Sequence, residues 1–156
     1  MVSSKLTMLA MVTDKRMRQW SIAVQGVGKL AGRRLVYFGV WPATIVNSRI
    51  RPRGSAHCSV YESGEVKLED FSIDLEYQNN GIGSKLLAEI EKWAASKGMR
   101  HLYGDLSNVD SDHFPMLHHL YTNHGWTWCL FGKGDSRLSP GSNIVGIVEK
   151  TISLKS

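Results

Sequence analysis

The residues best suited to chemistry lie in the segment Gln78–Ser84, which reads Gln-Asn-Asn-Gly-Ile-Gly-Ser. Two glycines in so short a segment let the backbone approach a ligand closely and adopt positive φ angles. A helical pattern begins directly after them, and the first turn of a helix presents unpaired N–H groups and the positive end of its dipole. Main-chain amides at this bend are therefore predicted to bind a diphosphate group.

The elements that position this loop are a strand before it and an amphipathic helix after it. The helix is predicted from Ile82, with apolar residues at helical spacing and Gly98 as its C-terminal stop. The strand is predicted over Val66–Leu75 from its alternation. This alternation places Val66, Leu68 and Asp70 on one face and Glu69, Phe71, Ile73 and Leu75 on the other; the helical stripe comprises Ile82, Leu86, Ile90 and Trp93, with Leu87 and Ala94 beside it.

Two other phosphate-binding loops fit the sequence less well. A dinucleotide-binding fingerprint needs a third Gly or Ala where this chain has Leu86. A Walker-type loop at Gly26–Lys29 has Ala23 in place of the first glycine and Leu30 in place of the Mg²⁺-binding hydroxyl. Neither is predicted.

The loop resembles the signature of the GNAT superfamily of acetyl-CoA-dependent N-acetyltransferases, Gln/Arg-x-x-Gly-x-Gly/Ala, at a strand-to-helix junction. Gln78, Gly81 and Gly83 match it, and Leu75 replaces a proline that usually precedes it. A second segment is similar to the family's aromatic-Tyr-x-x-x-Gly-aromatic ending of the next helix. Its matching residues are Tyr121, Gly125 and Trp126, and the two motifs together cover about residues 65–131.

The resemblance implies an α/β (α+β) fold with a GNAT-like mixed, mostly antiparallel splayed sheet flanked by helices. The splay would leave a groove for the pantetheine arm of coenzyme A. One GNAT-like acetyltransferase domain is expected over residues 1–156, because this length and the 42% hydrophobic content suit a single core. Further strands are predicted over 18–24, 35–40, 43–50, 56–61, 101–106, 126–131 and 143–154, with one short helix at most over Asp14–Trp20.

The cofactor implied by the resemblance is acetyl-CoA. The family's asparagine before the tyrosine falls at Phe114, and Ser107, Asn108 and Ser111 are polar groups that could replace it. The predicted cofactor-binding residues are Phe71, Ile73, Leu75, Gln78, Asn79, Asn80, Gly81, Ile82, Gly83, Ser84, Lys85, Ser107 and Asn108.

Acetyl transfer to an amine requires a base, since a lysine-like amine has a reference pKa of about 10.4. Glu69 is the first candidate because it is predicted to share a strand face with Ile73, upstream of the loop where several family members carry a catalytic glutamate. Asp70, Asp74 and Asp105 are alternatives, as is an ordinary surface role for each.

The departing thiolate requires a proton donor, and Tyr121 matches the family's tyrosine acid. The alternative for Tyr121 is an aromatic helix residue packed beside Leu117 and Leu120. The resemblance also implies that strand N–H groups around Phe71–Leu75 stabilise the oxyanion. The predicted activity is transfer of an acetyl group to a primary amine by direct attack in a ternary complex.

Charge is distributed unevenly along the chain. Residues 1–55 contain ten Lys or Arg against the single acid Asp14, whereas the other 101 residues contain nine basic and 13 acidic side chains. This split predicts either a basic face that recruits an anionic partner or two regions that attract each other within the fold. The alternative function is therefore a non-catalytic CoA-binding GNAT-fold module, or a nucleic-acid- or ribosome-associated protein that uses its basic N-terminal part.

The remaining composition favours a cytoplasmic protein that binds a small-molecule or peptide amine. No apolar run reaches 18 residues, and Leu6–Val12 lacks a convincing cleavage site. Cys58 and Cys129 are predicted to be buried and reduced. No metal site is predicted, because the histidines of the second helix are not spaced i,i+4; one of them could line the acceptor groove or act as a base. These histidines are His113, His118, His119 and His124.

Overall fold

The computed structural model describes residues 5–43, 47, 49–139 and 141–152. This part of the chain contains eight strands and two α-helices, with 3₁₀ turns at Leu75–Tyr77 and Asn108–His113. No helix in these residues is long and apolar enough to cross a membrane. The strands are β1 (Thr7–Thr13), β2 (Gln19–Leu30), β3 (Arg33–Pro42), β4 (Gly54–Tyr61), β5 (Glu65–Ile73), β6 (His101–Ser107), β7 (Thr127–Leu130) and β8 (Ile144–Thr151), and the helices are α1 (Ile82–Ser96) and α2 (Phe114–Asn123).

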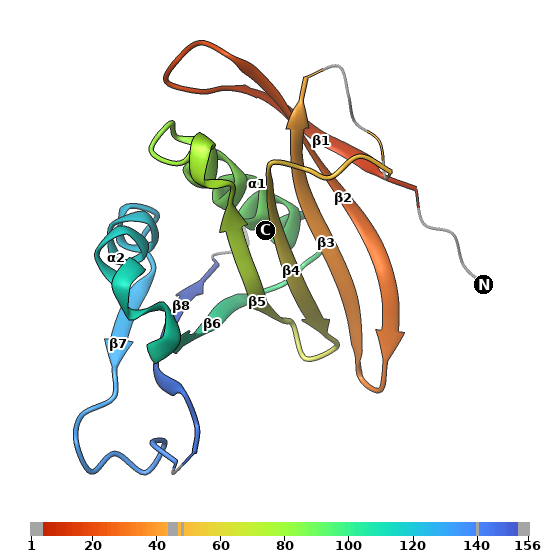
Figure 1. The fold of residues 1–156 in the computed structure, drawn as a ribbon. Coiled ribbons are helices and arrows are strands. Elements are labelled where there is room, and N and C mark those ends of the chain that lie inside the picture. Colours follow the sequence, from red (N-terminus) through yellow and green to blue (C-terminus); the bar gives the residue numbers. More distant parts are fainter. Residues whose placement is uncertain (1–4, 44–46, 48, 140, 153–156) are drawn as a thin grey trace.

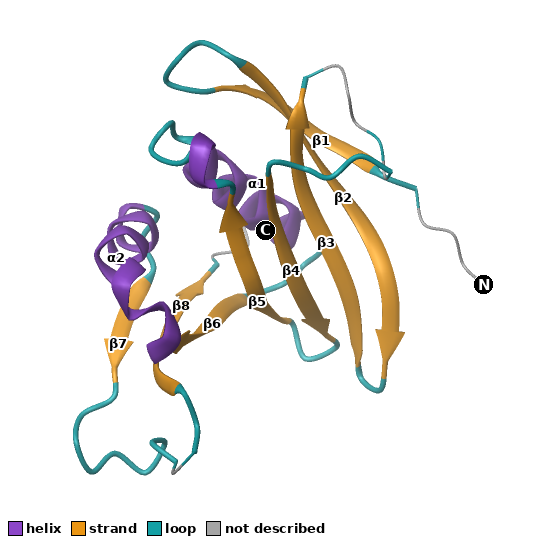
Figure 2. Cartoon of the chain, in the orientation of Figure 1, coloured by secondary structure: helices purple, strands orange, loops and turns teal. Residues whose placement is uncertain are grey.

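The strands form one sheet in the order β1-β2-β3-β4-β5-β6-β8-β7. Every neighbouring pair is antiparallel except β5 and β6, which run parallel with α1 as their crossover. Figure 1 shows β1–β5 as one curved half and β6–β8 as a second half that diverges from it. In Figure 2, α1 lies behind the first half and α2 lies beside the second. The predicted mixed, mostly antiparallel and splayed sheet is confirmed.

The N-terminal part is a run of hairpins. β1 was not predicted, because its sequence, TMLAMVT, does not alternate clearly between apolar and polar residues. The strand predicted over 43–50 falls partly on residues 44–46 and 48, which lie outside the described residues; Ile50 N–H donates to the Asn47 carbonyl in a turn. The strand predicted over 56–61 is confirmed as part of β4, which forms a hairpin with β5 in which Val60 pairs with Val66.

The helix predicted over Asp14–Trp20 is wrong, because these residues form the turn between β1 and β2 and the start of β2. The Asp14 carboxylate accepts the N–H groups of Arg16 and Arg18 at 2.8 and 2.9 Å, so its side chain takes up donors within the turn. Met17 adopts a left-handed φ of 66°, which a helix does not allow.

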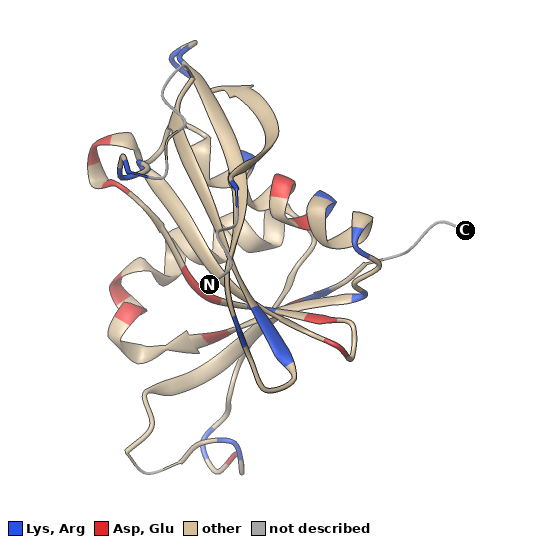
Figure 3. Ribbon diagram, turned by 90° about the vertical axis from the view of Figure 1, so that its right-hand side faces the viewer, with Lys and Arg blue, Asp and Glu red and all other residues tan. Residues whose placement is uncertain are grey.

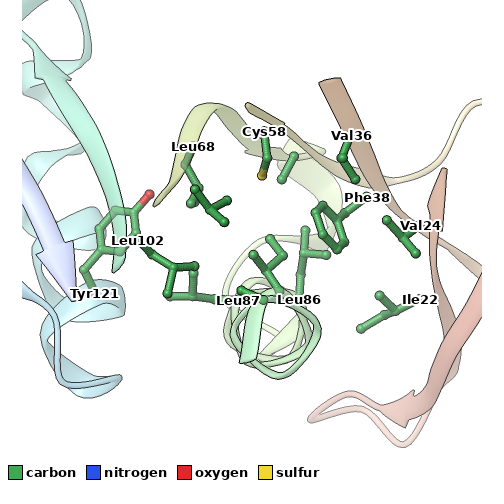
Figure 4. Close-up of a cluster of buried hydrophobic side chains, with 14 of the residues drawn as sticks. Ile22, Val24, Val36, Phe38, Cys58, Leu68, Leu86, Leu87, Leu102 and Tyr121 are labelled. Carbon is green, nitrogen blue, oxygen red and sulfur yellow. The ribbon is translucent and has the colours of Figure 1, made fainter. Parts of the chain in front are cut away.

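The core lies between α1 and the first half of the sheet. The predicted apolar face of α1 is confirmed as buried, except that Trp93 is only partly buried. The ring of Phe38 on β3 contacts the Trp93 ring edge-on, with 5.3 Å between the ring centroids. Figure 4 shows side chains of β2–β5 directed toward Leu86 and Leu87. Each such buried side chain contributes about 1.5–3 kcal/mol relative to exposure. The fully buried residues of α1 are Ile82, Leu86, Leu87, Ile90 and Ala94.

A β-bulge in β5 changes which residues share a face. Cys58 pairs with Leu68 and His57 pairs with Asp70, so Glu69 is the extra residue. The prediction that Glu69 shares a face with Phe71 and Ile73 is therefore wrong. Phe71 and Ile73 pack against the core together with Leu68, and Glu69 hydrogen-bonds on the opposite face.

The splay begins at the same point. The ladder between β5 and β6 joins only 65–68 to 101–104, although both strands continue beyond it. Along residues 69–73, the edge of β5 that faces β6 has no partner strand among the described residues. An open strand edge is thus created next to the end of β6.

Asp14 is the one buried acid of the N-terminal turn, and its side chain is fully covered. Burial raises the pKa of this carboxyl, but hydrogen bonds from Trp20, Arg18 and Arg16 outweigh that effect and lower the pKa to about 2. Since the folded-state pKa is lowered, the stabilising contribution is complete above the unfolded-state pKa of about 4 and is lost as pH falls through about 2.

We therefore expect Asp14→Asn to lower Tm by several degrees at neutral pH, with a difference from the unsubstituted protein that shrinks between about pH 4 and pH 2. Calorimetric melts across this range test it. Asp112→Asn, which changes an exposed carboxylate, serves as the control and should melt like the unsubstituted protein. A difference between Asp14→Asn and the unsubstituted protein that stays constant down to pH 2 would contradict the assignment.

Candidate active site

A cavity of about 830 Å³ occupies the gap between the two halves of the sheet. Its walls come from the ends of β5 and β6, the loop before α1, α2 and the β1–β2 turn. The cavity therefore extends from the glycine loop to the interior of the splay. Its lining includes Asp14, Lys15, Glu69, Phe71, Ile73, Gln78, Gly81, Gly83, Ser84, Asp105, Ser107 and Tyr121.

The glycine loop ends in an uncapped helix. Gly81, the N-cap of α1, has a left-handed φ of 87° and carries no side chain that could accept from the first turn. The N–H groups of this turn remain available to an anion. Gln78 Nε2 donates to the Ile73 carbonyl at 2.9 Å and so holds the loop against the end of β5.

Most predicted cofactor-binding residues line the cavity, but three do not. Leu75 is 84% exposed on the 3₁₀ turn, and Ile82 points into the core with 1% exposure. Asn108 lies on the surface, with its N–H bound to the Asn143 carbonyl. Those that line it are Phe71, Ile73, Gln78, Asn79, Asn80, Gly81, Gly83, Ser84, Lys85 and Ser107.

Tyr121 is buried at the inner wall of the cavity. Its ring lies 5.1 Å from that of Trp126 and 6.5 Å from that of Phe71. In Figure 4 its hydroxyl points toward the side of the core where Leu68 lies. Burial, aided by nearby Cys58, raises the pKa of this hydroxyl well above 10.0, so Tyr121 keeps its proton at neutral pH.

The four candidate carboxylates have different surroundings. Glu69 accepts a hydrogen bond from Ser59 Oγ at 2.9 Å and pairs with Arg33 at 3.2 Å. Lys67 Nζ lies between Glu69 and Asp105, at 3.3 and 3.1 Å. Burial lowers the pKa of Lys67, but these carboxylates outweigh it and raise the pKa overall.

The other two candidates are Asp70 and Asp74. Asp70 lines the cavity with a side chain 66% exposed, and His57 Nδ1 lies 3.8 Å away. Asp74 lies outside the lining and binds Arg51 through both oxygens, at 2.9 and 2.8 Å. Asp74 is therefore not positioned to act within the cavity.

The histidines are dispersed around α2. His113 and His119 line the cavity, whereas His118 packs on the Trp128 ring. His124 Nε2 lies 2.7 Å from Ser84 Oγ, which connects the end of α2 to the start of α1. Among the described residues, no group of three or more His, Cys, Asp or Glu could hold a metal ion.

Both cysteines are free. Cys58 is buried in the core, as predicted, and burial followed by the charge of Glu69 raises the pKa of its thiol. Cys129 is only partly buried. A thiol protonated in this way, as Cys58 is, does not act as a nucleophile at neutral pH.

Charge differs between the two ends of the cavity. Among the described residues, the lining contains two Lys side chains: Lys15, which lies against Gly81, and Lys85, which is in the first turn of α1. Glu69, Asp70 and Asp105 lie at the other end, where β5 and β6 separate. The loop end thus suits an anion, whereas the inner end is acidic, with part of its negative charge offset by Arg33 and Lys67.

Part of the basic charge of the N-terminal residues is paired with acidic side chains elsewhere in the fold. Figure 3 shows Lys and Arg in several separate segments, with acidic segments between them in this view. Arg33 pairs with Glu69, and Arg51 pairs with Asp74 at 2.8 Å. Attraction within the fold, one of the two predicted alternatives, accounts for these two residues.

A sequence model of the Acetyltransferase (GNAT) family matches residues 21–126, which include the cavity's loop and Tyr121. The chain belongs to this family. The resemblance inferred from the two motifs is therefore confirmed. A search of curated proteins found no match.

Solved structures share the GNAT fold. A GNAT-family acetyltransferase of Staphylococcus aureus has a TM-score of 0.55 at 16% identity, with 78% of this chain and 69% of that chain covered. A GNAT-family acetyltransferase of Streptococcus pneumoniae has a TM-score of 0.52 at 21% identity, with 80% of this chain and 70% of that chain covered. The PaiA N-acetyltransferase of Thermoplasma acidophilum, in complex with coenzyme A, has a TM-score of 0.51 at 18% identity, with 76% of this chain and 61% of that chain covered.

The β1–β2 turn contributes to this cavity, which the sequence motifs do not predict. Thr13, Asp14 and Lys15 line it, although the motifs begin some sixty residues later. The available signal was an Asp followed at short range by Arg16 and Arg18, which is typical of a side-chain-stabilised turn. Nothing in the sequence pattern placed this turn beside the glycine loop.

Tyr121 lines the cavity, and the raised pKa of its hydroxyl is due to burial and to nearby Cys58, with no hydrogen bond among the causes. We expect Tyr121→Phe to change the free energy of unfolding by less than about 0.5 kcal/mol. Tyr121→Ala, which empties the ring's place beside Trp126, should cost about 3–5 kcal/mol. Urea denaturation of both variants measures this, and a large loss in Tyr121→Phe would show that the hydroxyl is structural.

Proposed function

We propose that this GNAT-family chain, as a single acetyltransferase domain, moves an acetyl or other short acyl group from acyl-CoA to a primary amine by direct attack in a ternary complex. The observation that carries this proposal is the continuous cavity, which joins the uncapped end of α1 to Tyr121 along the open edge of β5.

The residues present fit coenzyme A. Its diphosphate would be held by N–H groups of Gly81–Lys85, where no side chain competes for them. A Cβ on Gly83 would lie 3.6 Å from Ile73 Cγ1. Without a side chain, Gly83 leaves the cavity open between the first turn of α1 and the end of β5. Unpartnered backbone groups of 69–73 would receive the pantetheine amides.

The thioester supplies an activated acyl group when it is bound, and the chain supplies proton transfer and positioning. Tyr121 Oη, which stays protonated at neutral pH, is proposed to donate to the departing thiolate. Glu69 is the proposed base for the amine, and Asp70 and Asp105 are the alternative candidates that line the cavity. Their negative charge also favours an acceptor that arrives as a cation.

The proposal requires coenzyme A to lie on the glycine loop. We expect Gly83→Val to abolish detectable binding of CoA in calorimetry, because the branched side chain would stand over the first turn of α1. Ala95→Val places the same side chain on α1 outside the cavity lining and should bind normally. Undiminished binding by folded Gly83→Val would place the cofactor elsewhere.

Tyr121 tests the chemistry. Tyr121→Phe should lower kcat by about 100-fold in a thiol-release assay with acetyl-CoA and an amine library, while the Kd for CoA changes little. Tyr103→Phe, a tyrosine of β6 outside the cavity lining, should retain full activity. Tight CoA binding without turnover on any amine, unaffected by Tyr121→Phe, would favour a CoA-binding module instead.

A further inference from the structure

The β1–β2 turn is attached to the glycine loop. Lys15 N–H donates to the Asn80 carbonyl at 2.9 Å, and Thr13, Asp14 and Lys15 line the same cavity as Gly81. In Figure 1 this turn lies beside the segment that leads into α1. A segment more than sixty residues away in the sequence is therefore held at the predicted diphosphate site.

The Lys15 side chain crosses the N-cap of α1. Its Cγ and Cε atoms lie 3.7 and 3.8 Å from the point where a Cβ on Gly81 would be. Nζ is one bond beyond Cε, so the ammonium group is held near the first turn of the helix. These distances are those of van der Waals contact, so the Lys15 stem lies against the N-cap residue.

The charge of Lys15 is not neutralised by the fold. Neighbouring Asp14 uses Oδ1 for two N–H groups and Oδ2 for Arg18 Nε and Trp20 Nε1, at 2.8 and 3.0 Å. No ion pair joins Lys15 to any residue of the described segments, whereas Arg18 and Lys67 both have carboxylate partners. The N-terminal turn thus presents an unpaired cation over an uncapped helix end.

We propose that Lys15 binds the diphosphate of coenzyme A, so that the β1–β2 turn forms a second wall of that site opposite the helix N–H groups. This assignment rests on the proposed function, because it needs the coenzyme on the glycine loop. A cation on one side and main-chain amides on the other complement a group with two negative charges. Lys85, on the first turn of α1, flanks the same position.

The test is the Kd of coenzyme A and of dephospho-coenzyme A, measured by calorimetry at low salt. Lys15→Met keeps the apolar stem over Gly81 and removes the charge. It is expected to weaken both coenzymes by about three- to tenfold, with a smaller dependence on salt than in the unsubstituted protein. Lys15→Arg should retain affinity within about twofold, because it keeps the charge.

Arg16→Met is the matched control. Arg16 is exposed on the same turn and lies outside the cavity lining, so its loss should change either Kd by less than about twofold. An equal loss of coenzyme affinity in Arg16→Met and Lys15→Met would show that the positive charge of the turn acts at long range, and it would overturn a direct contact between Lys15 and the diphosphate. Thermal melts of each variant establish that it is folded.

The remaining outcomes are distinct. Unchanged affinity for both coenzymes in Lys15→Met overturns the assignment. A loss of affinity for coenzyme A alone would show that Lys15 contacts the 3′-phosphate, and this overturns the assignment as well. If the unsubstituted protein binds neither coenzyme, the proposed function itself fails, and this assignment fails with it.

Discussion

The separation of β5 from β6 after Leu68 is the constraint on which the rest of the structure depends. Four residue pairs join these parallel strands, and the bulge at Glu69 begins where the ladder stops. Closing the sheet further would fill the cavity and remove the open edge of β5. The core tolerates the opening because α1 covers the first half and Tyr121 on α2 closes the inner wall of the cavity.

The bulge also divides β5 into a part that packs in the core and a part that lies at the glycine loop. Before it, Val66 and Leu68 pack in the core; after it, Phe71 and Ile73 return to the same face and meet the glycine loop. Glu69, the extra residue, lies on the opposite face, where Ser59, Arg33 and Lys67 surround it. Without this insertion, strict alternation would put a carboxylate in the core.

Much of the fold and of the site could be predicted from local patterns. The helix after Gly81, the β4–β5 hairpin and the family motifs are all signals confined to a few consecutive residues. The face of Glu69 could not be predicted, because a bulge is defined by its partner strand. The turn at Asp14–Arg18 and its place beside Asn80 depend on a side chain closing on the backbone and on a contact between distant segments. Patterns of period 2 or 3.6 carry no information on either.

The bare N-cap of α1 has a thermodynamic consequence for the protein as a whole. A helix that begins at glycine forgoes the side-chain hydrogen bond of a serine or aspartate cap, at a cost of roughly a few tenths of a kcal/mol. An anion seated at this end supplies the missing acceptors, so binding there completes the secondary structure as well as filling a pocket. Saturation with such a ligand should therefore protect the amides at the start of α1 from hydrogen exchange, in addition to raising global stability by mass action.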